Sequence, residues 1–341
     1  INFKIKEPKP EDKFELITRN TAGSNNLFTN FTSLSSSSKK SSYYGYVNYK
    51  KGDGFRPNSE FESINTFQNF NYNLNEKSKI IGEITYMEYL AHQAGGLSDF
   101  MFANDPFQSN RERNWFEIKW FLYNLKYLLE ISEDSSFSFS FFGLDAKRNS
   151  LGFRTNRVDQ IDYGDERDLI KGNFKNFGFE SRYLTNYSFF NRKSYLLLGV
   201  KYYNSYSQST QGPGSNSKDA DFNFDYASFP NYVNQSEYSY PNNNLAIFGE
   251  NIYYLNEKLS ITPGFRFENI NTSLDGYYRK INLDAAGNTI YNERFDEQDT
   301  KKRKFLLLGL GLSYRNQDLE IYTNFSQNFR SVTFADISII N

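Results

Sequence analysis

The chain has 341 residues, a formal net charge of −1 and no cysteine. Its balanced charge argues against a nucleic-acid binder, which needs a basic surface, and the lack of cysteine excludes disulfides, Cys-ligated zinc and thiol nucleophiles. With His92 as the only histidine, a histidine-rich metal site or a Ser–His–Asp triad is not expected, and neither is an enzyme.

Aromatic side chains dominate the composition. Phe, Tyr and Trp make up 18% of the residues, with 34 Phe and 27 Tyr, yet the mean hydropathy is −0.70. Ordinary soluble cores contain more Leu, Val, Ile and Ala, whereas half-buried strands with aromatic ends combine aromatic and polar residues in this way. The longest apolar run, FLLLGLGL at 305–312, is far shorter than the run of about 18 residues that a membrane helix needs.

The two ends of the chain look cut. INFKIKEPKP lacks the apolar core of a secretory signal, and the chain stops abruptly at SIIN. We therefore expect a fragment of a longer protein.

Apolar and polar residues alternate with a period of two along the chain. In SSFSFSFFG at 135–143, Phe alternates with Ser, while LAIFGENIYYL at 245–255 is ambiguous because both of its faces carry apolar residues. The alternation returns in KLSITPGFRFE at 258–268 and LEIYTNFS at 319–326. Such alternation indicates half-buried strands, although Pro263 counts against its own strand because proline donates no ladder hydrogen bond.

Short polar turns alternate with long connections after the first two strands. The short turns lie at 35–40, 75–77, 132–135, 191–193, 256–258 and 316–318. The long connections are centred near 53–58, 95–110, 150–171, 206–242 and 272–302. Antiparallel neighbours then place all short turns at one end of the sheet and all long loops at the other.

That asymmetry is typical of outer-membrane barrels, which have short periplasmic turns and longer extracellular loops. We count about thirteen strands, many of about 10–14 residues, where a tilted membrane strand needs about 9–11. A soluble β-sandwich or propeller also explains the alternation, but it does not sort loops by end. It also predicts no aromatic girdle, whereas Tyr43, Tyr86, Tyr253 and Tyr314 fall near strand ends. The sequence thus predicts an all-β, antiparallel transmembrane barrel.

Several stretches resemble the barrel of TonB-dependent outer-membrane receptors, most closely the ferric-dicitrate receptors. INFKIKEPKP resembles the last strand of the plug domain, and YYGYVNYKKGDGFRPNSEF at 43–61 is similar to an early hairpin of the barrel. AGGLSDFMFANDPFQSNRERNWF at 94–116 resembles the third extracellular loop of that group. LSITPGFRFE and YTNFSQNFRSVTFADI look like later barrel strands.

The resemblance implies a plugged barrel of about 22 strands, of which this chain would supply about thirteen. Residues 1–11 would be the tail of the plug domain, and 12–341 the N-terminal part of the barrel. The implied partners are a ferric chelate, the protein's own plug, TonB and outer-membrane lipids, with no nucleic acid. No cofactor or resident metal is implied, because the ferric iron would belong to the transported chelate.

The connection at 91–116 would then fold over the barrel mouth. A ferric citrate complex is an anion, and Arg suits carboxylates through its bidentate geometry. Arg111 and Arg113, two residues apart, share one face of an extended chain, and Gln108 offers a donor and an acceptor. The alternative interpretation is that they are solvated loop charges, partly paired with Glu112 and Asp105.

The remaining candidates for ligand contact carry less specific signals. They are Arg148, Arg154, Arg157, Arg56, His92 and Gln93. A histidine adds little to iron that is already chelated, so we expect His92 to hydrogen-bond within a loop. The acidic run at 159–168 could hold a hard cation, but it lacks the ordered spacing of a calcium loop, and a solvated surface is the preferred interpretation.

Three functions therefore follow from the sequence. The first is TonB-energised uptake of a ferric chelate, such as ferric citrate or a similar siderophore, and the second is uptake of a sugar, peptide or vitamin by the same machinery. The third is a passive porin or a purely structural barrel. In all three the protein lies in the bacterial outer membrane, with long loops extracellular and short turns periplasmic.

The run KFLLLGLGLSY at 304–314 predicts the face that meets lipid. Leu306, Leu308, Leu310 and Leu312 should face the hydrocarbon, and the intervening Gly309, Gly311 and Ser313 should face the lumen. Phe305 and Leu307 would then be an unexplained apolar start on the inner face.

Overall fold

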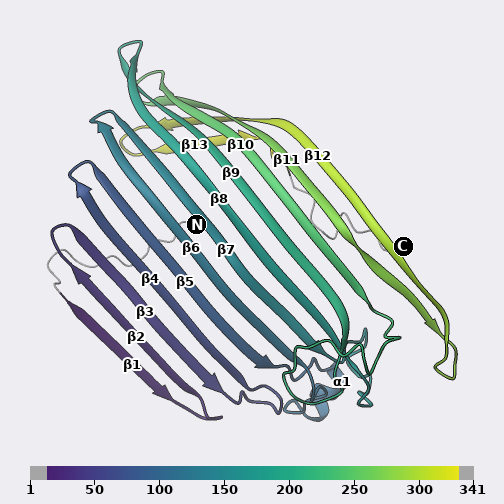
Figure 1. The fold of residues 1–341 in the computed structure, drawn as a ribbon. Coiled ribbons are helices and arrows are strands. Elements are labelled where there is room, and N and C mark those ends of the chain that lie inside the picture. The colour runs from purple at the N-terminus through teal and green to yellow at the C-terminus, as the bar shows by residue number, and fades with distance from the viewer. Residues whose placement is uncertain (1–13, 330–341) are drawn as a thin grey trace.

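A computed structural model describes residues 14–329 of the chain. They form one sheet of thirteen antiparallel strands in chain order, with a short helix, α1, between β5 and β6 (Figure 1). The strands are β1 Glu15–Ala22, β2 Phe28–Ser37, β3 Ser41–Gly52, β4 Phe61–Asn75, β5 Ser78–His92, β6 Trp115–Ser132, β7 Ser135–Gly152, β8 Arg167–Phe189, β9 Arg192–Gly214, β10 Ser236–Tyr254, β11 Leu259–Leu283, β12 Thr289–Arg315 and β13 Glu320–Ser326. The helix is Asp99–Asn104. The all-β prediction and the strand count are confirmed.

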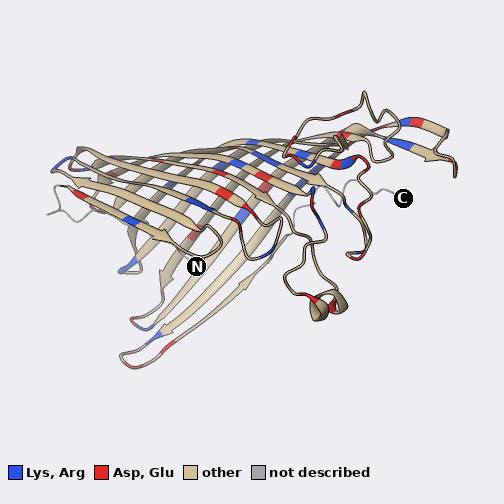
Figure 2. Ribbon diagram, turned by 90° about the horizontal axis from the view of Figure 1, so that it is seen from below, with Lys and Arg blue, Asp and Glu red and all other residues tan. Residues whose placement is uncertain are grey.

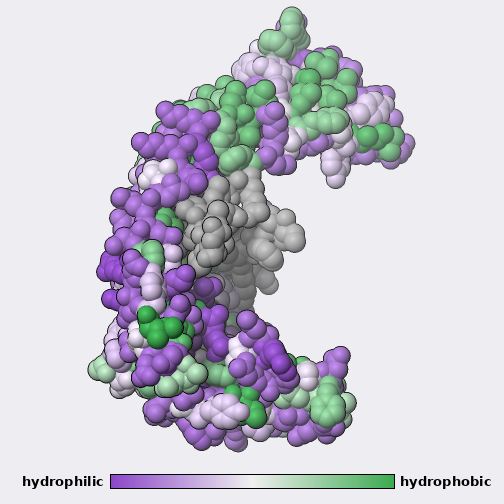
Figure 3. Space-filling model, turned by 90° about the vertical axis from the view of Figure 1, so that its right-hand side faces the viewer, coloured by the Kyte–Doolittle hydropathy of each residue, from purple (hydrophilic) through white to green (hydrophobic). Residues whose placement is uncertain are grey.

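The sheet curves into an open arc (Figure 3). Within residues 14–329, β1 and β13 each pair with a single neighbour, so both are edge strands. In this part of the chain no helix is long and apolar enough to cross a bilayer. The predicted plug tail, 1–11, lies outside the described residues, and so does the end of the YTNFSQNFRSVTFADI stretch, from residue 330 onward.

The short turns lie together at one end of the sheet and the longer connections at the other (Figure 1). The turn between β8 and β9 consists of Phe190 and Asn191, both with positive φ (48° and 57°). That conformation matches the twist of a two-residue hairpin. The predicted sorting of loops by end is confirmed.

Two predictions about segment lengths are wrong. The region 272–302 is not a loop: β11 and β12 continue as a paired ladder to a five-residue turn at 284–288. The strands are also longer than predicted, with 25 residues in β11 and 27 in β12. The turn predicted at 35–40 is also shorter than expected, because β2 continues to Ser37. The outward-facing residues of these strand extensions are polar. The alternation of apolar and polar residues, from which strands were predicted, is therefore absent there.

One face of the sheet carries an apolar band. Leu306, Phe267, Ile247 and Val200 are register partners on β12, β11, β10 and β9 and so share a face. Of these, Leu306 is 53% exposed and Ile247 43%. Side chains on the outside of a curved sheet diverge from one another, so this exposed face is the convex one. A lipid-facing surface is expected to be apolar.

The opposite, concave face is polar. The adjacent row of register partners points to this face and consists of Glu268, Ala246, Lys201 and Glu180 on β11, β10, β9 and β8. Lys201 Nζ lies 3.9 Å from the Glu180 carboxylate. On β5, both carboxylate oxygens of Glu83 are occupied, since Asn69 donates at 3.1 Å and Asn124 at 2.9 Å. The concave face therefore carries charged and amide groups on β4–β6 and on β8–β11.

An aromatic residue organises the cationic part of the concave face. The Phe248 ring lies 5.9 Å from the guanidinium of Arg182 and 5.3 Å from that of Arg266. The ring covers Gly199, where an added Cβ would come within 2.3 Å of it. Glycine at position 199 thus leaves room for the Phe248 ring to contact both guanidinium groups.

The predicted register of KFLLLGLGLSY is confirmed. Leu306, Leu308 and Leu310 are exposed on the convex face, at 53%, 54% and 37%. Phe305, on the other face, packs against Phe329 with ring centroids 4.2 Å apart, which accounts for its apolar character.

The tyrosines predicted near strand ends lie on the convex face. Tyr253 and Tyr314 are next to the turns at 255–258 and 316–319, and Tyr43 follows the turn at 38–40. Tyr86 lies toward the loop end of the apolar band. Aromatic rings at both borders of an apolar band are typical of membrane girdles.

Candidate functional site: the loop cap

Three connections meet at the loop end of the sheet (Figure 1). They are residues 93–114, which include α1, residues 153–166 and residues 215–235. We call these three segments together the loop cap. Figure 2 shows α1 standing away from the strands at this end of the molecule.

Arg113 joins all three segments of the loop cap. Its Nε donates to the Asp162 carboxylate at 2.9 Å, and its Nη2 contacts the other oxygen of the same carboxylate. Nη1 donates to the carbonyls of Asp165, at 2.7 Å, and Asn216, at 3.1 Å. The side chain is only 5% exposed. This is the bidentate geometry that the sequence predicted for a ligand carboxylate, here made with a carboxylate of the protein itself.

Arg167, at the start of β8, holds the third segment. It is completely buried and donates to the carbonyls of Ser215 (2.8 Å), Arg113 (3.2 Å) and Asp219 (2.7 Å). Its Nη2 also donates to the hydroxyls of Ser215 (2.9 Å) and Ser217 (3.0 Å). Burial, followed by the nearby Arg113 charge, lowers the pKa of Arg167. The guanidinium thus replaces solvent for five acceptors.

Arg111 binds the middle segment through backbone carbonyls. Its guanidinium donates to Asn110, Gln160 and Val158, at 2.6, 3.2 and 3.3 Å. It also lies 5.2 Å from the Phe153 ring centroid. Arg111 and Arg113 reach the same loop, as expected of side chains that share a face, but neither pairs with Glu112 or Asp105.

Asp168 collects donors from three elements. It accepts from Arg154 Nη1 at 2.9 Å, from Gln211 Nε2 at 2.9 and 3.0 Å, and from the Tyr232 hydroxyl at 2.8 Å. Burial and the adjacent carboxylate raise the pKa of Tyr232 above its usual range. Tyr232 therefore stays a neutral donor, and the pair fixes residues 215–235 to β8 and β9.

Arg56 and Gln108 stabilise the α1 segment. Arg56 donates to the carbonyls of Gln108 (2.9 Å), Ala94 (3.2 Å) and Gly95 (2.9 Å). Gln108 donates through its amide to the Met101 carbonyl at 2.6 Å. The predicted side-chain donor of Gln108 is therefore used within the loop, while the group that accepts from Arg56 is the backbone carbonyl of Gln108.

His92 hydrogen-bonds within the loop end, as predicted. Its Nδ1 is 2.9 Å from the Glu60 carboxylate and its Nε2 is 2.7 Å from the Glu112 carbonyl. The ring stacks on Trp115 at 4.0 Å, and the Trp115 indole donates to the Lys218 carbonyl at 2.8 Å. Gln93 is exposed beside it.

Three predicted arginines remain accessible, and one of them, Arg154, is 50% exposed although its Nη1 pairs with Asp168. Arg148 is exposed, with its guanidinium 5.9 Å from the Phe174 ring. Arg157 is 77% exposed and pairs with Asp159 at 2.8 Å. Among the nine predicted ligand residues, these three arginines and Gln93 are the ones exposed to a solute. Ligand contact by any of the nine stays a prediction.

The residues that sequence reasoning missed are mostly the partners of these arginines. They include Asp162, Arg167, Asp168, Gln211, Ser215 and Tyr232. The acidic run at 159–168 was a usable signal, because a carboxylate-rich loop needs cations nearby. A second usable signal was Ser98 followed by Asp99, which marks the start of helix α1. The Ser98 side chain caps this helix by accepting a hydrogen bond from the Met101 amide at 3.3 Å, as N-cap serines do. In residues 14–329 no three His, Asp or Glu side chains gather as metal ligands do.

We expect the loop cap to loosen in acid. Burial opposes ionisation of Asp162, yet the contacts with Arg113 and the Gly164 amide outweigh it and lower the pKa of Asp162. The stability that this carboxylate contributes is complete above the unfolded pKa of about 3.9 and is lost as pH falls through the lower folded value. Pepsin cleavage within residues 153–166 should therefore rise steeply below about pH 4.

The Asp162→Asn variant is the control for this titration. It should be cleaved readily at all values between about pH 2 and pH 5, without the steep rise. An unchanged pH profile in the variant would assign the transition to another group.

No family model and no curated protein matches the chain in sequence. Its fold is similar to several solved structures. The ferric citrate transporter FecA in its unliganded form aligns with a TM-score of 0.72 and 17% identity, over 95% of this chain and 45% of that one. The siderophore receptor PiuA from Acinetobacter baumannii aligns with a TM-score of 0.72 and 9% identity, over 94% and 50%.

The copper transporter OprC aligns with a TM-score of 0.62 and 14% identity, over 93% of this chain and 46% of that one. The chain thus spans half or less of the length of these proteins. At such identities the likeness concerns the fold, and it extends over nearly the whole chain.

Proposed function

We propose, from the barrel fold that this chain shares with the TonB-dependent outer-membrane receptors, that it is part of a receptor that imports a ferric chelate. The observation that carries the proposal is the combination of a convex apolar band, a polar concave face and a bonded loop cap at one end of the strands. A passive pore needs the first two, whereas the third is expected of a protein that collects a solute at its mouth. The chelate is ferric citrate or a similar siderophore.

The rest of the machinery belongs to the same proposal. The polar concave face would contact the protein's own plug, and TonB would energise release of the bound chelate into the periplasm. The fold likeness to a ferric citrate transporter and a siderophore receptor supports iron as the cargo. The likeness to a copper transporter favours a second candidate, TonB-dependent uptake of another solute.

Radiolabelled iron uptake by intact cells tests the proposal. Deleting the complete gene should abolish uptake of iron supplied as citrate or as one siderophore, and a tonB deletion should have the same effect. TonB-dependent uptake of copper or an organic solute, with normal iron uptake, would support the second candidate. Uptake that survives loss of TonB would identify a passive barrel and overturn both.

The proposal also predicts sidedness. An epitope inserted between Ala227 and Ser228, an exposed stretch of the 215–235 connection, should bind antibody on intact cells. One inserted after Glu257, in the turn between β10 and β11, should bind only after the outer membrane is opened. The reverse pattern would invert the topology.

A further inference from the structure

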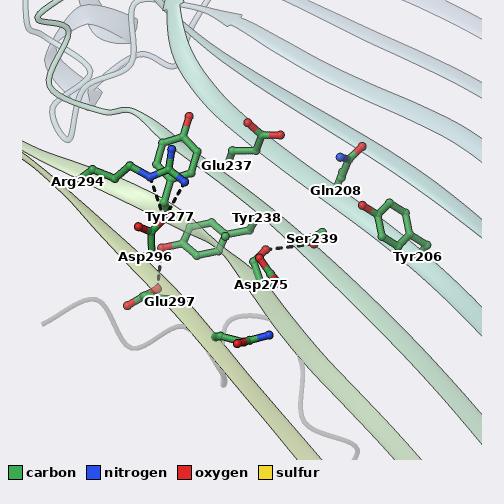
Figure 4. A pocket seen from close by; sticks show the side chains of 12 residues that line it. Tyr206, Gln208, Glu237, Tyr238, Ser239, Asp275, Tyr277, Arg294, Asp296 and Glu297 are labelled. Atoms are coloured by element: carbon green, nitrogen blue, oxygen red, sulfur yellow. Dashed lines mark hydrogen bonds and ion pairs between the residues drawn. The ribbon is translucent and has the colours of Figure 1, made fainter.

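A cavity of about 570 Å³ lies on β9–β12, next to the 215–235 segment of the loop cap (Figure 4). Its lining includes Tyr206, Glu237, Asp275, Tyr277, Arg294 and Asp296. None of these residues was singled out by the sequence, because they fall in regions that were predicted as loops.

The cavity opens on the convex face. Asp275 and Tyr277 lie on β11 an even number of residues from Phe267, which belongs to the apolar row described above, so all three share a face. Glu237 on β10 and Asp296 on β12 are both register partners of Tyr277, so their side chains lie on the same face of the sheet. The cavity therefore lies on the convex side beyond the end of the apolar band, from which Asn269, Asn271 and Ser273 separate it on β11.

The cavity wall is held in place by its own contacts. The Arg294 guanidinium stacks on the Tyr277 ring at 3.8 Å and pairs with Asp296 at 2.7 Å. Below them, the Tyr238 hydroxyl donates to Glu297 at 2.7 Å. The Tyr277 ring is thus fixed by a cation on one side, and its orientation does not depend on a ligand.

Other polar groups at the cavity make no side-chain hydrogen bond or ion pair within the described chain. In residues 14–329 this holds for the carboxylates of Glu237 and Asp275 and for the Gln208 amide, although the Tyr226 hydroxyl is near enough to Glu237 to interact with its charge. Tyr206, with 43% of its surface exposed, adds a second ring. The two carboxylates can accept hydrogen bonds, and the Gln208 amide can both donate and accept them. All three groups line the cavity together with aromatic rings.

This composition discriminates between ligand classes. Four carboxylates line the cavity with one guanidinium, so phosphate, sulfate and ferric polycarboxylates would be repelled. The described acidic residues do not converge as metal ligands do, and the polar lining disfavours a purely apolar ligand. Sugar rings are bound by carboxylates and amides, which form hydrogen bonds with the sugar hydroxyls. They are also bound by flat aromatic rings, which cover the C–H surface of the sugar.

We propose that this cavity binds a saccharide, an uncharged polyhydroxylated ring, on the outer wall of the barrel. The sugar could belong to a glycolipid of the outer leaflet, because the cavity opens on the same face as the apolar band, or to a free glycan. Either source presents the same hydroxyls, and the site is separate from the proposed uptake of a chelate.

The test compares two variants of the complete receptor. The Glu237→Gln, Asp275→Asn double variant keeps the shape of both side chains and weakens their acceptor strength. Asp145→Asn is the matched control, since Asp145 is an exposed carboxylate on β7 that pairs only with Lys175, at 3.7 Å. The probes are a deacylated, dephosphorylated lipopolysaccharide core oligosaccharide in solution and nanodiscs that contain intact lipopolysaccharide.

We expect saturable binding of a probe by the native receptor and by Asp145→Asn, weakened 10-fold or more in the double variant. Binding of the soluble oligosaccharide would identify free glycan as a sufficient source, and binding in lipopolysaccharide nanodiscs alone would identify the glycolipid. Absence of binding to both probes, or equal binding by the double variant, would overturn the proposal. Iron uptake should be unaffected in all variants, so the result is independent of the proposed transport function.

Discussion

Replacing Arg167 with alanine is expected to release the loop cap while leaving the sheet intact. The buried guanidinium donates five hydrogen bonds that join β8 to residues 113 and 215–219. A hydrogen bond from a charged donor contributes about 1.5–3 kcal/mol. Several are lost together, and their acceptors stay buried, so the cap should lose at least about 3 kcal/mol. That loss corresponds to a rise of roughly 100-fold in the open population.

Hydrogen exchange followed by mass spectrometry measures this release. Peptides from 93–114, 153–166 and 215–235 should exchange much faster in Arg167→Ala, and peptides from β9 and β10 should be unchanged. Arg167→Lys should fall between the two, because it keeps the charge with fewer donors.

Arg157→Ala is the matched control for an arginine in the same region. Arg157 is 77% exposed and pairs only with Asp159, two residues away, so its loss should leave the exchange of all three segments unchanged. If Arg157→Ala and Arg167→Ala behaved alike, the loop cap would not be held by the buried arginines. Ligand affinity measured on the same variants would then show whether binding needs the cap closed.

The Leu308→Arg variant is expected to show the second large effect. Leu308 is 54% exposed on the convex face, in register with Phe265 of β11. A charged side chain on the lipid face costs about 2–4 kcal/mol at the midplane of the membrane and less toward its borders. We expect the variant of the complete receptor to unfold at lower denaturant concentration in bilayers and to reach the outer membrane in smaller amount.

Ser313→Arg is the corresponding change on the other face of β12. Ser313 pairs with Ser260 and lies on the polar, concave side, where a cation can stay hydrated. This variant should retain stability close to that of the native receptor. Equal tolerance of arginine at 308 and 313 would mean that β12 does not present its leucines to lipid.

Some limits of sequence reasoning follow from particular elements. The period-two pattern located KLSITPGFRFE within β11 and KFLLLGLGLSY within β12, but it placed a loop at 272–302 where the two strands continue as a hairpin. Beyond the apolar band both faces of these strands meet polar surroundings, so the alternation of apolar and polar residues disappears although the ladder persists. Helix α1 was missed for a related reason: six residues are too few to show a helical period.

The candidate site shows a different limit. The sequence correctly marked residues 91–116 as a special connection, and it identified Arg111 and Arg113 as its strongest cations. It could not identify what they bind, because the Asp162 carboxylate that Arg113 contacts is 49 residues away, and Arg167 had no distinguishing pattern at all. A guanidinium satisfies a ligand carboxylate and a protein carboxylate equally well, so residue type alone does not separate the two roles.

What the sequence by itself determined is the part of the protein that depends on neighbours along one strand or one hairpin. Alternation decides which side chains share a face, and the position of short turns decides which strand ends lie together, so the sheet, its order and its lipid-facing register follow from local pattern. Only the tertiary structure decided how the loop cap and the convex cavity are built. Their partners come from connections or strands far apart in sequence, and these meet only after the sheet has aligned the strand ends, where burial removes water and leaves each charge to the nearest acceptor.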